Sequence, residues 1–304
     1  ISDVKNGKNE LVGEKIESIM IDKLVGVFMP ENDSVGRLVS RQQGSNRADI
    51  KLKVSNEEQL YMGFGNRQTK HMDFSIRSEM KIDDFVPVFI PPKEIISSTS
   101  NFTSLYDDYH IDIDETYYDL ARLLMRALKK GPNTNEQNSV LAKFSEIMNG
   151  NVFQKDNKFY LRVKGAGEFE MGLVSEGYRK LSTLTYLILS GSLNKNAILF
   201  WDEPETNMNP KLISHVANAL IKLSQMGVQI FVSTHSYFVQ QSFNLFAEYQ
   251  NKGKNKIDIQ FMSLYRKEEL GQLHCEVAKN LFEITQNAIM EEFDAIYDRE
   301  QELI

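Results

Sequence analysis

The sequence predicts an α/β fold in which a mostly parallel β-sheet is flanked by helices, and three observations support this prediction. The run Ala197-Ile-Leu-Phe-Trp-Asp-Glu203 is typical of a buried strand that ends in charge. The run Val228-Gln-Ile-Phe-Val-Ser-Thr-His235 repeats the pattern with hydroxyls and an imidazole at its end. Residues 209–225, which lie between the two runs, predict a helix. Strands that are apolar on both faces favour the interior of a parallel sheet.

The N-terminal third of the chain predicts a helix and an antiparallel β-subdomain. Residues 11–28 place apolar side chains at helical spacing, and Pro30 ends that helix. Residues 48–76 instead alternate apolar and polar side chains in three short runs separated by polar turns, which predicts an antiparallel meander. Residues 85–90 predict one further strand, closed by two prolines that cannot continue a ladder.

The middle of the chain predicts a helical lobe. Residues 98–113 are rich in Ser, Thr, Asn, Asp and Tyr and predict a long exposed loop. A helix is expected over 115–130, a shorter one over 138–149, and a hairpin over 153–171. One face of the first helix is basic, and we interpret it either as a solvated face or as a surface for a partner or nucleic acid. It carries Arg122, Arg126, Lys129 and Lys130.

The C-terminal part continues the pattern with a capped helix and a terminal hairpin. Asn209 and Pro210 suit the N-cap and first position of the helix that ends near Gln225. A helix over 236–249 and a hairpin of 257–265 with 273–277 follow. The tail over 283–304 is acidic but has a stripe of apolar residues, which we expect to dock on its own domain. The stripe consists of Leu281 and Phe282, just before the tail, and Ile289, Phe293 and Ile296 within it.

The acids that follow the first apolar run are the strongest candidates for chemistry. The carboxyl ends of parallel strands are where such sheets bind ligands, and Asp202 in a Walker B element would hold Mg²⁺. Glu203 would polarise the water that attacks a γ-phosphate, and His235 can donate a hydrogen bond to a phosphate oxygen. The alternative is a strand followed by an acidic turn without a catalytic role.

A third motif precedes the helix over 180–190. Ser175 is a candidate N-cap, and a helix start with a hydroxyl and Gly177 beside it forms a phosphate-binding surface. The chain thus has three motifs in order: Ser-Glu-Gly before a helix, a strand that ends in Asp-Glu, and a strand that ends in Ser-Thr-His. This ordered set resembles the motifs of the ABC-type ATPase family. More narrowly, residues 170–240 resemble the ABC-like, AAA-class ATP-binding proteins of bacterial anti-phage operons and the overcoming-lysogenization-defect nucleases.

The resemblance implies ATP and Mg²⁺ as cofactors and a head-to-tail dimer as the working state. It implies that Ser175 and Gly177 of one chain contact the γ-phosphate held by the other, with Arg179 supporting that loop. His235 would sense the γ-phosphate, and Glu205 would brace the strand tip. ATP binding would close the dimer and hydrolysis would reopen it.

The sequence contains no Gly-x-x-x-x-Gly-Lys-Ser/Thr loop, whose backbone amides would cradle phosphates. The first residue is Ile1 rather than Met, so we expect the chain to begin just after that loop, with the missing N-terminal segment as its partner and with residues 1–304 alone inactive. The family's glutamine after the 85–90 strand is also missing. Lys93 and Glu94 are candidates by position, and the alternative is an ordinary salt pair at the strand end.

As a whole, the chain is expected to form a single ATPase head lacking its phosphate-loop part. We divide it into 1–96 (N-terminal helix and β-subdomain), 97–192 (helical lobe with the signature motif) and 193–304 (Walker B and His-switch core, C-terminal hairpin and helix). The expected function is that of an ATP-driven switch in anti-phage defence that acts with an effector nuclease. The alternatives are a DNA-acting ATPase of the chromosome-maintenance type and a non-catalytic scaffold.

The composition fits these expectations. A net charge of −7 gives no global reason for nucleic-acid binding, so any interaction with DNA is expected to be weak. The single cysteine, Cys275, cannot form an internal disulfide, which favours a reducing cytoplasm, and we expect it to be a packed strand residue. No apolar run approaches the ~20 residues of a membrane helix, and no sustained heptad pattern favours a coiled coil.

Overall fold

The computed structural model describes residues 9–41, 44–54, 57–76, 85–109, 111–267 and 272–304. The chain divides into two compact units, one formed by residues 1–85 and 104–119 and the other by residues 86–103 and 120–304. The helices α2 (Thr99–Tyr109) and α3 (Glu115–Leu124) each contribute residues to both units. Each unit has its own buried side chains.

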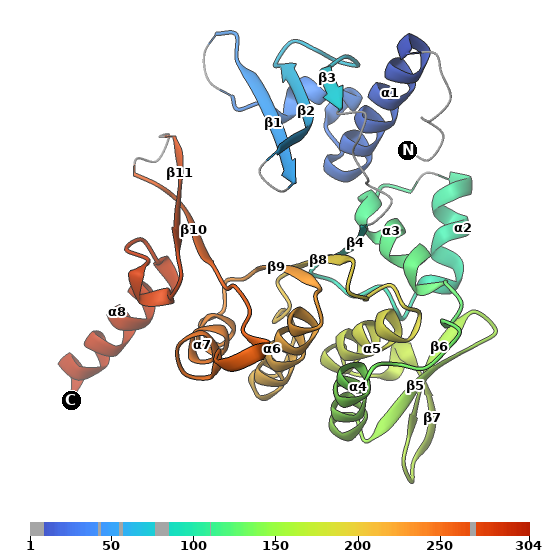
Figure 1. The fold of residues 1–304 in the computed structure, drawn as a ribbon, viewed down its shortest axis with the longest axis vertical. Helices are drawn as coiled ribbons and strands as arrows, with labels where there is room; N and C mark the ends of the chain where they lie inside the picture. The colour runs from blue at the N-terminus through green and yellow to red at the C-terminus, as the bar shows by residue number, and fades with distance from the viewer. Residues whose placement is uncertain (1–8, 42–43, 55–56, 77–84, 110, 268–271) are drawn as a thin grey trace. The chain divides into compact units, whose positions relative to one another are not determined.

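The first unit combines one long helix with an antiparallel sheet, as the sequence predicts (Figure 1). The helix α1 is Asn9–Phe28, and the strands β1 (Arg47–Val54), β2 (Glu57–Gly65) and β3 (Asp73–Ile76) pair in the order β1-β2-β3. The core between helix and sheet is apolar. Its buried members are Ile21, Val35, Val39, Leu60, Met62, Phe64 and Met72.

The second unit contains the parallel sheet, in the order β4-β8-β9. Its strands are β4 (Val86–Ile90), β8 (Ala197–Asp202) and β9 (Gln229–Ser233), and both pairings are parallel. The helices α5 (Glu176–Leu189) and α6 (Pro210–Gln225) lie on one side of it (Figure 1). This confirms the predicted α/β class.

The two faces of this sheet are covered to different extents. Leu199 and Trp201, which alternate with Phe200 along β8 and so share the other face of the strand, are at most 1% exposed. On the opposite face Phe89, Phe200 and Phe231 are neighbours in register, and each is at least 37% exposed. The expected burial of β8 on both faces is therefore found on one face only among the described residues.

The remaining elements of the second unit form a helical lobe, a small antiparallel sheet and a C-terminal hairpin. The lobe sheet pairs in the order β5-β6-β7, and β10 pairs with β11. The elements are α4 (Asn135–Ile147), β5 (Gly150–Lys155), β6 (Lys158–Val163), β7 (Gly167–Glu170), α7 (Tyr237–Leu245), β10 (Phe261–Arg266), β11 (Leu273–Ala278) and α8 (Ala288–Leu303), with a π-helical turn over Phe246–Gln250.

Two predictions for the middle of the chain are wrong. The expected loop over 98–113 contains α2, because Thr99 and Phe102 are buried despite the polar composition of the segment. The helix expected over 115–130 ends at Leu124, because the following backbone binds α5 instead. The carbonyl of Arg126 accepts a hydrogen bond from the Tyr186 hydroxyl, and the N–H of Lys129 donates to the carbonyl of Leu189. The four basic residues therefore do not share one helical face.

Two predictions for the C-terminal part also need correction. Cys275 lies on β11 as expected but is exposed rather than packed. The apolar stripe of the tail docks only in part. Phe293 stacks on Tyr237 with ring centroids 4.3 Å apart, yet α8 has no buried residue.

No helix in the described part of the chain has the length and apolar character that crossing a bilayer requires.

Candidate functional site

The candidate site lies at the carboxyl ends of β8 and β9, where the predicted acids and the histidine come together. Asp202 is the register partner of Ser233, whose hydroxyl donates a hydrogen bond to Asp202 Oδ1. The next residue, Glu203, has its carboxylate Oε1 3.7 Å from His235 Nε2. Its other oxygen, Oε2, accepts a hydrogen bond from the Thr206 hydroxyl at 2.9 Å. The strand tip thus presents two carboxylates beside an imidazole that is 85% exposed.

Glu205 ties the turn after β8 to the end of β9. Its Oε1 accepts hydrogen bonds from the Thr234 hydroxyl at 2.7 Å and from the His235 backbone N–H at 2.9 Å. Its Oε2 is buried and has no hydrogen-bond partner. These contacts place the His235 backbone relative to the turn, which supports the bracing role expected for Glu205.

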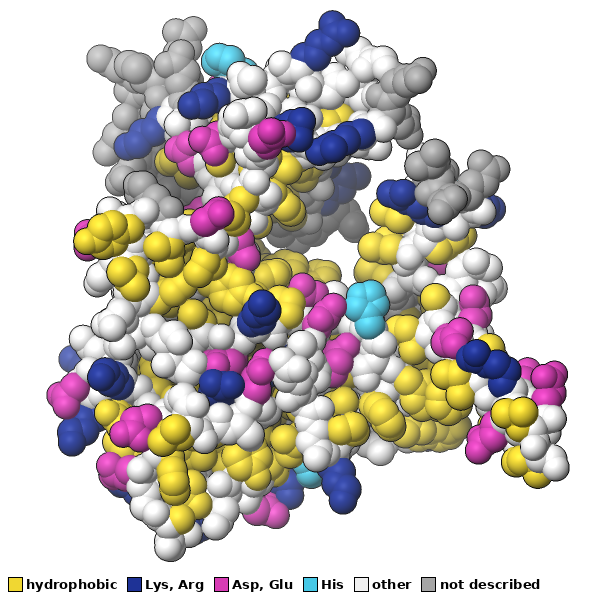
Figure 2. All heavy atoms as spheres, turned by 180° about the vertical axis from the view of Figure 1, so that it is seen from behind, with side chains coloured by type: hydrophobic (Ala, Val, Ile, Leu, Met, Phe, Trp, Pro, Cys, Tyr) yellow, Lys and Arg dark blue, Asp and Glu magenta, His cyan; other side chains and the backbone are white. Residues whose placement is uncertain are grey.

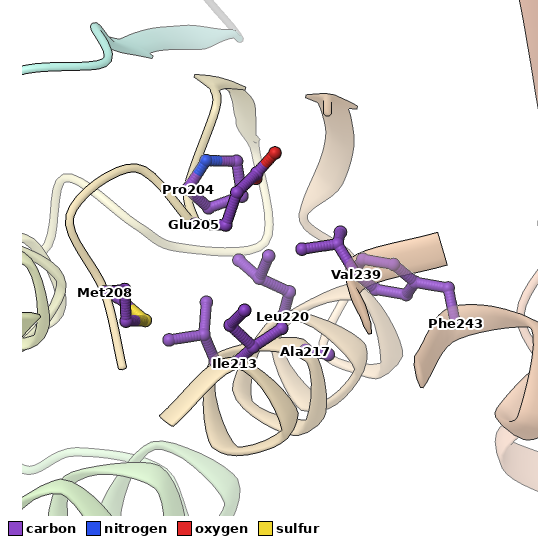
Figure 3. A pocket seen from close by; sticks show the side chains of 9 residues that line it. Pro204, Glu205, Met208, Ile213, Ala217, Leu220, Val239 and Phe243 are labelled. Carbon is purple, nitrogen blue, oxygen red and sulfur yellow. The ribbon is translucent and has the colours of Figure 1, made fainter. Parts of the chain in front are cut away.

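Below this turn, α6 and α7 form an apolar floor. Figure 3 shows Pro204 and Glu205 above a cavity that side chains of the two helices line from below and from one side. Its volume is about 10 Å³, close to the minimum for one water molecule. The labelled helix residues at the cavity are Ile213, Ala217, Leu220, Val239 and Phe243. The turn therefore lies on a packed apolar support.

The start of α5 carries the predicted Ser-Glu-Gly motif. Ser175 occupies the N-cap position with extended backbone, as predicted, but its exposed hydroxyl makes no capping hydrogen bond. Gly177 faces the turn before α6, and a Cβ atom there would lie 3.1 Å from Leu212 Cδ1 and 3.6 Å from Met208 Cγ. The glycine thus permits a close approach between the two segments. The exposed carboxylate of Glu176 also accepts a hydrogen bond from Asn207 Nδ2 at 3.0 Å.

Arg179 is held by an ion pair with Glu94, beyond the end of β4. Arg179 Nη1 lies 2.9 Å from Glu94 Oε1, and the Glu94 side chain is only 8% exposed. Ser97 donates two further hydrogen bonds to this carboxylate, from its hydroxyl at 2.7 Å and from its N–H at 3.1 Å. The sequence offered a site role or an ordinary salt pair at the strand end for Lys93 and Glu94. In the structure Glu94 forms an ion pair, and its partner is Arg179 on α5.

Lys180 is a residue of the site that the sequence interpretation missed. Its side chain is 2% exposed, and its ammonium donates to three carbonyl oxygens of the turn after β8. Burial lowers the pKa of Lys180 below that of a free lysine, and nearby carboxylates offset part of this effect. The signal was present in the sequence, because Lys180 shares a helix face with Leu184 and Leu187, both fully buried.

The donors at the strand tips are compatible with Mg²⁺ but do not enclose it. Asp202 and Ser233 offer carboxylate and hydroxyl oxygens, the ligand type that Mg²⁺ prefers. In the part of the chain that is described, no three His, Cys, Asp or Glu side chains are grouped to hold a metal ion. Any Mg²⁺ here would take most of its ligands from water and phosphate oxygens, which is its usual coordination at nucleotide sites.

Comparison with solved structures agrees with this architecture. An SMC head bound to the C-winged helix domain of ScpA is similar to the chain with a TM-score of 0.51 and 10% sequence identity, covering 91% of this chain and 90% of that one. An SMC head domain from Thermotoga maritima gives a TM-score of 0.36 with 14% identity, over 66% of this chain and 67% of that one. The first of these two similarities shows that the fold is like that of an SMC or ABC ATPase head.

Comparison of sequences identifies the family. A segment of 47 residues is 43% identical to the Old nuclease of Escherichia phage P2, and it spans 16% of this chain but only 8% of that protein. Residues 44–239, well over half of the chain and including both strand tips and the start of α5, match the family described as "AAA domain, putative AbiEii toxin, Type IV TA system". The chain therefore belongs to this family of AAA domains.

Proposed function

We propose that the chain is the ATP-binding and hydrolysing head of a switch protein, with its catalytic centre at the tips of β8 and β9. The observation that carries the proposal is the meeting of Asp202, Glu203 and His235 at adjacent carboxyl ends of a parallel sheet, in a chain of an AAA family. In sheets of this kind ligands bind beyond the carboxyl ends of the strands. Nucleotide binding with Mg²⁺ is what the family implies.

In this proposal the two carboxylates have different tasks. Asp202 holds Mg²⁺, directly or through water, and the metal neutralises charge that develops on the phosphates. Glu203 orients or deprotonates the attacking water, and His235 donates a hydrogen bond to the γ-phosphate. The 3.7 Å separation between Glu203 and His235 supports this assignment, because a water held by Glu203 and a phosphate oxygen bound by His235 can then belong to one reaction site.

The start of α5 serves a second nucleotide in a head-to-tail dimer. Ser175 has a hydroxyl that is not used for capping, and helix starts favour phosphate. Gly177 keeps this segment close to the turn after β8, and Arg179 stabilises it through Glu94. ATP binding would join two heads and hydrolysis would separate them.

The phosphate-binding loop is proposed to come from a segment outside residues 1–304 that docks beside β9. Two features support this. Among the described strands, β9 pairs with β8 alone, so one of its edges is open. The stacked rings of Phe200 and Phe231, 4.8 Å apart, also present an exposed apolar face that a helix could cover.

The proposed biological role is anti-phage defence together with an effector nuclease. The similarity to part of the Old nuclease supports this, since nuclease and ATPase activity would then be linked in one system. The described structure offers little to support the alternative of a DNA-acting ATPase. Lys and Arg side chains lie among Asp and Glu side chains over most of the face in Figure 2.

The proposal is tested with Asp202→Asn and Glu203→Gln in a form of the protein that carries a phosphate-binding loop. Asp202→Asn is expected to weaken Mg-ATP binding in a calorimetric titration, because it removes a metal ligand. Glu203→Gln is expected to keep binding and to accumulate an ATP-bound dimer that light scattering detects. Unchanged Mg-ATP affinity in Asp202→Asn would contradict the metal assignment, and a monomeric Glu203→Gln with bound ATP would contradict the switch.

A further inference from the structure

We infer that Lys180 is a positioning residue that holds the catalytic turn, residues 203–206, against the start of α5. The inference rests on the proposed function of Glu203 and deepens it. Lys180 is proposed to act through the backbone of Glu203 and not by contact with nucleotide or water. No sequence motif contains it, and its role follows from three contacts and one backbone angle.

The contacts use the whole hydrogen-bonding capacity of the lysine. Lys180 Nζ lies 2.7 Å from the carbonyl oxygen of Thr206, 3.3 Å from that of Glu203 and 3.4 Å from that of Pro204. A lysine ammonium has three N–H donors and no acceptor. The three carbonyls therefore match the three donors, so every N–H of this buried ammonium has an acceptor.

The backbone of Glu203 needs such support because it is in a rarely occupied conformation. Its φ angle is +45°, in the left-handed region, and it is not a glycine. Such residues persist only where their surroundings fix them, and they cluster at functional sites. The N–H of Glu203 donates to the carbonyl of Ser233 at 3.0 Å, and the carbonyl of Glu203 accepts from the Thr206 N–H at 3.1 Å and from Lys180 Nζ at 3.3 Å. Together these bonds set the direction of the Glu203 carboxylate.

The charges around Lys180 favour the protonated form that makes these bonds. Burial has the largest effect and lowers the pKa of Lys180, and the carboxylates of Glu176, Glu205, Glu203 and Glu94 offset part of that lowering. Carbonyl dipoles pointing at the ammonium add to this stabilisation. An apolar side chain of similar length, such as methionine, would leave the three carbonyls without this donor.

The same contacts join the two segments of one chain that are proposed to act on different nucleotides of the dimer. Ser175 and Gly177, at the start of α5, are proposed to face the partner's nucleotide, whereas Glu203 faces the chain's own nucleotide. Lys180 connects the two segments rigidly from inside, and the hydrogen bond between Glu176 and Asn207 connects them at the surface. A displacement of α5 would therefore move the Glu203 carboxylate.

The test compares Lys180→Met with the wild-type protein in a form that carries a phosphate-binding loop. Lys143→Met is the matched control, because Lys143 is 45% exposed and, among the residues that the structure describes, forms its ion pair with Glu146, one turn along the same helix. Hydrogen exchange is measured over residues 203–208, where the N–H groups of Glu203, Thr206 and Met208 are hydrogen-bonded. ATP turnover gives kcat and KM, and circular dichroism verifies folding.

We expect Lys180→Met to speed exchange over 203–208 and to lower kcat on the order of 10- to 100-fold with little change in KM, because a misplacement of about 1 Å can cost that much. We also expect no further loss when Lys180→Met is added to Glu203→Gln, because both changes remove the action of one carboxylate. If Lys180→Met does not fold, Lys180→Gln replaces it; it keeps two N–H donors, so the expected loss of kcat is about 3- to 10-fold.

Three results would overturn the inference. These are unchanged exchange over 203–208, faster exchange with wild-type kcat, and losses that multiply in the double variant. Failure of the proposed function gives a different result, namely wild-type kcat in Glu203→Gln itself. Wild-type kcat in Lys180→Met together with a slow Glu203→Gln would overturn the positioning role alone.

Discussion

Replacing Arg179 by Met should destabilise the second unit, because it leaves the Glu94 carboxylate buried without its charge partner. The Glu94 side chain is 8% exposed and would keep only its two hydrogen bonds from Ser97. Breaking a buried pair by removing one partner typically costs about 3–5 kcal/mol, and we expect the lower end, about 3 kcal/mol, because the Ser97 bonds remain. For a domain of this size such a loss corresponds to a fall in Tm of about 6–12 °C.

The assay is urea unfolding of wild type, Arg179→Met, Glu94→Gln and the double variant. A double-mutant cycle should give a coupling free energy of about 2 kcal/mol, since the two residues are in direct contact. The control is Arg299→Met. Because Arg299 and Glu292 form an exposed ion pair, the expected loss in the free energy of unfolding is about 0–1 kcal/mol. A change below about 0.5 kcal/mol for Arg179→Met, or additive free energies in the cycle, would refute the reasoning.

Three further predictions concern packing, pH and nucleic acid. Leu220→Ala should lower the free energy of unfolding by about 2–5 kcal/mol, since Leu220 is 1% exposed in the floor beneath Glu205; calorimetry giving wild-type stability would contradict this. Hydrogen bonds from the N–H groups of Thr285 and Gln286 lower the pKa of Glu276. The stability that Glu276 provides is thus present above the usual carboxyl range and is lost as pH falls through its lowered pKa. The NMR protection factors of those two amides, which correct for the intrinsic pH dependence of exchange, should follow this titration and become insensitive to pH in Glu276→Gln; equal protection factors across the acidic range in the wild type would contradict it. Finally, the basic residues 122–130 should not give nanomolar DNA binding near physiological salt, because the helix expected to align them ends at Leu124; a persistent gel shift would contradict this.

The parts of the fold that the sequence predicts correctly depend on local pattern. The apolar run into Asp202 and Glu203 and the run ending in His235 specify strands whose parallel register then brings those side chains together. The capped start of α6 at Asn209, whose side chain accepts from the N–H of Lys211, is equally local. Such features are encoded within a few residues of each other.

The features that sequence reasoning missed depend on contacts between distant segments. The helix after residue 115 ends because Tyr186 and Leu189 bind the backbone that follows it, which no local pattern indicates. Glu94 meets Arg179 only after β4 and α5 have packed. Lys180 was a partial exception, because a lysine on an otherwise apolar helix face could have been recognised as buried and therefore in need of acceptors.

The most direct test of the proposed catalytic centre is the steady-state ATP turnover of Glu203→Gln in a form of the protein that carries a phosphate-binding loop. The amide keeps the size of the side chain and can still accept from the Thr206 hydroxyl, but it cannot take a proton from water. Glu146→Gln, on an exposed pair with Lys143, is the control. We predict a fall in kcat of about 100- to 10,000-fold for Glu203→Gln with ATP binding retained. Turnover equal to that of the wild type would contradict the assignment of the β8 tip as the catalytic centre.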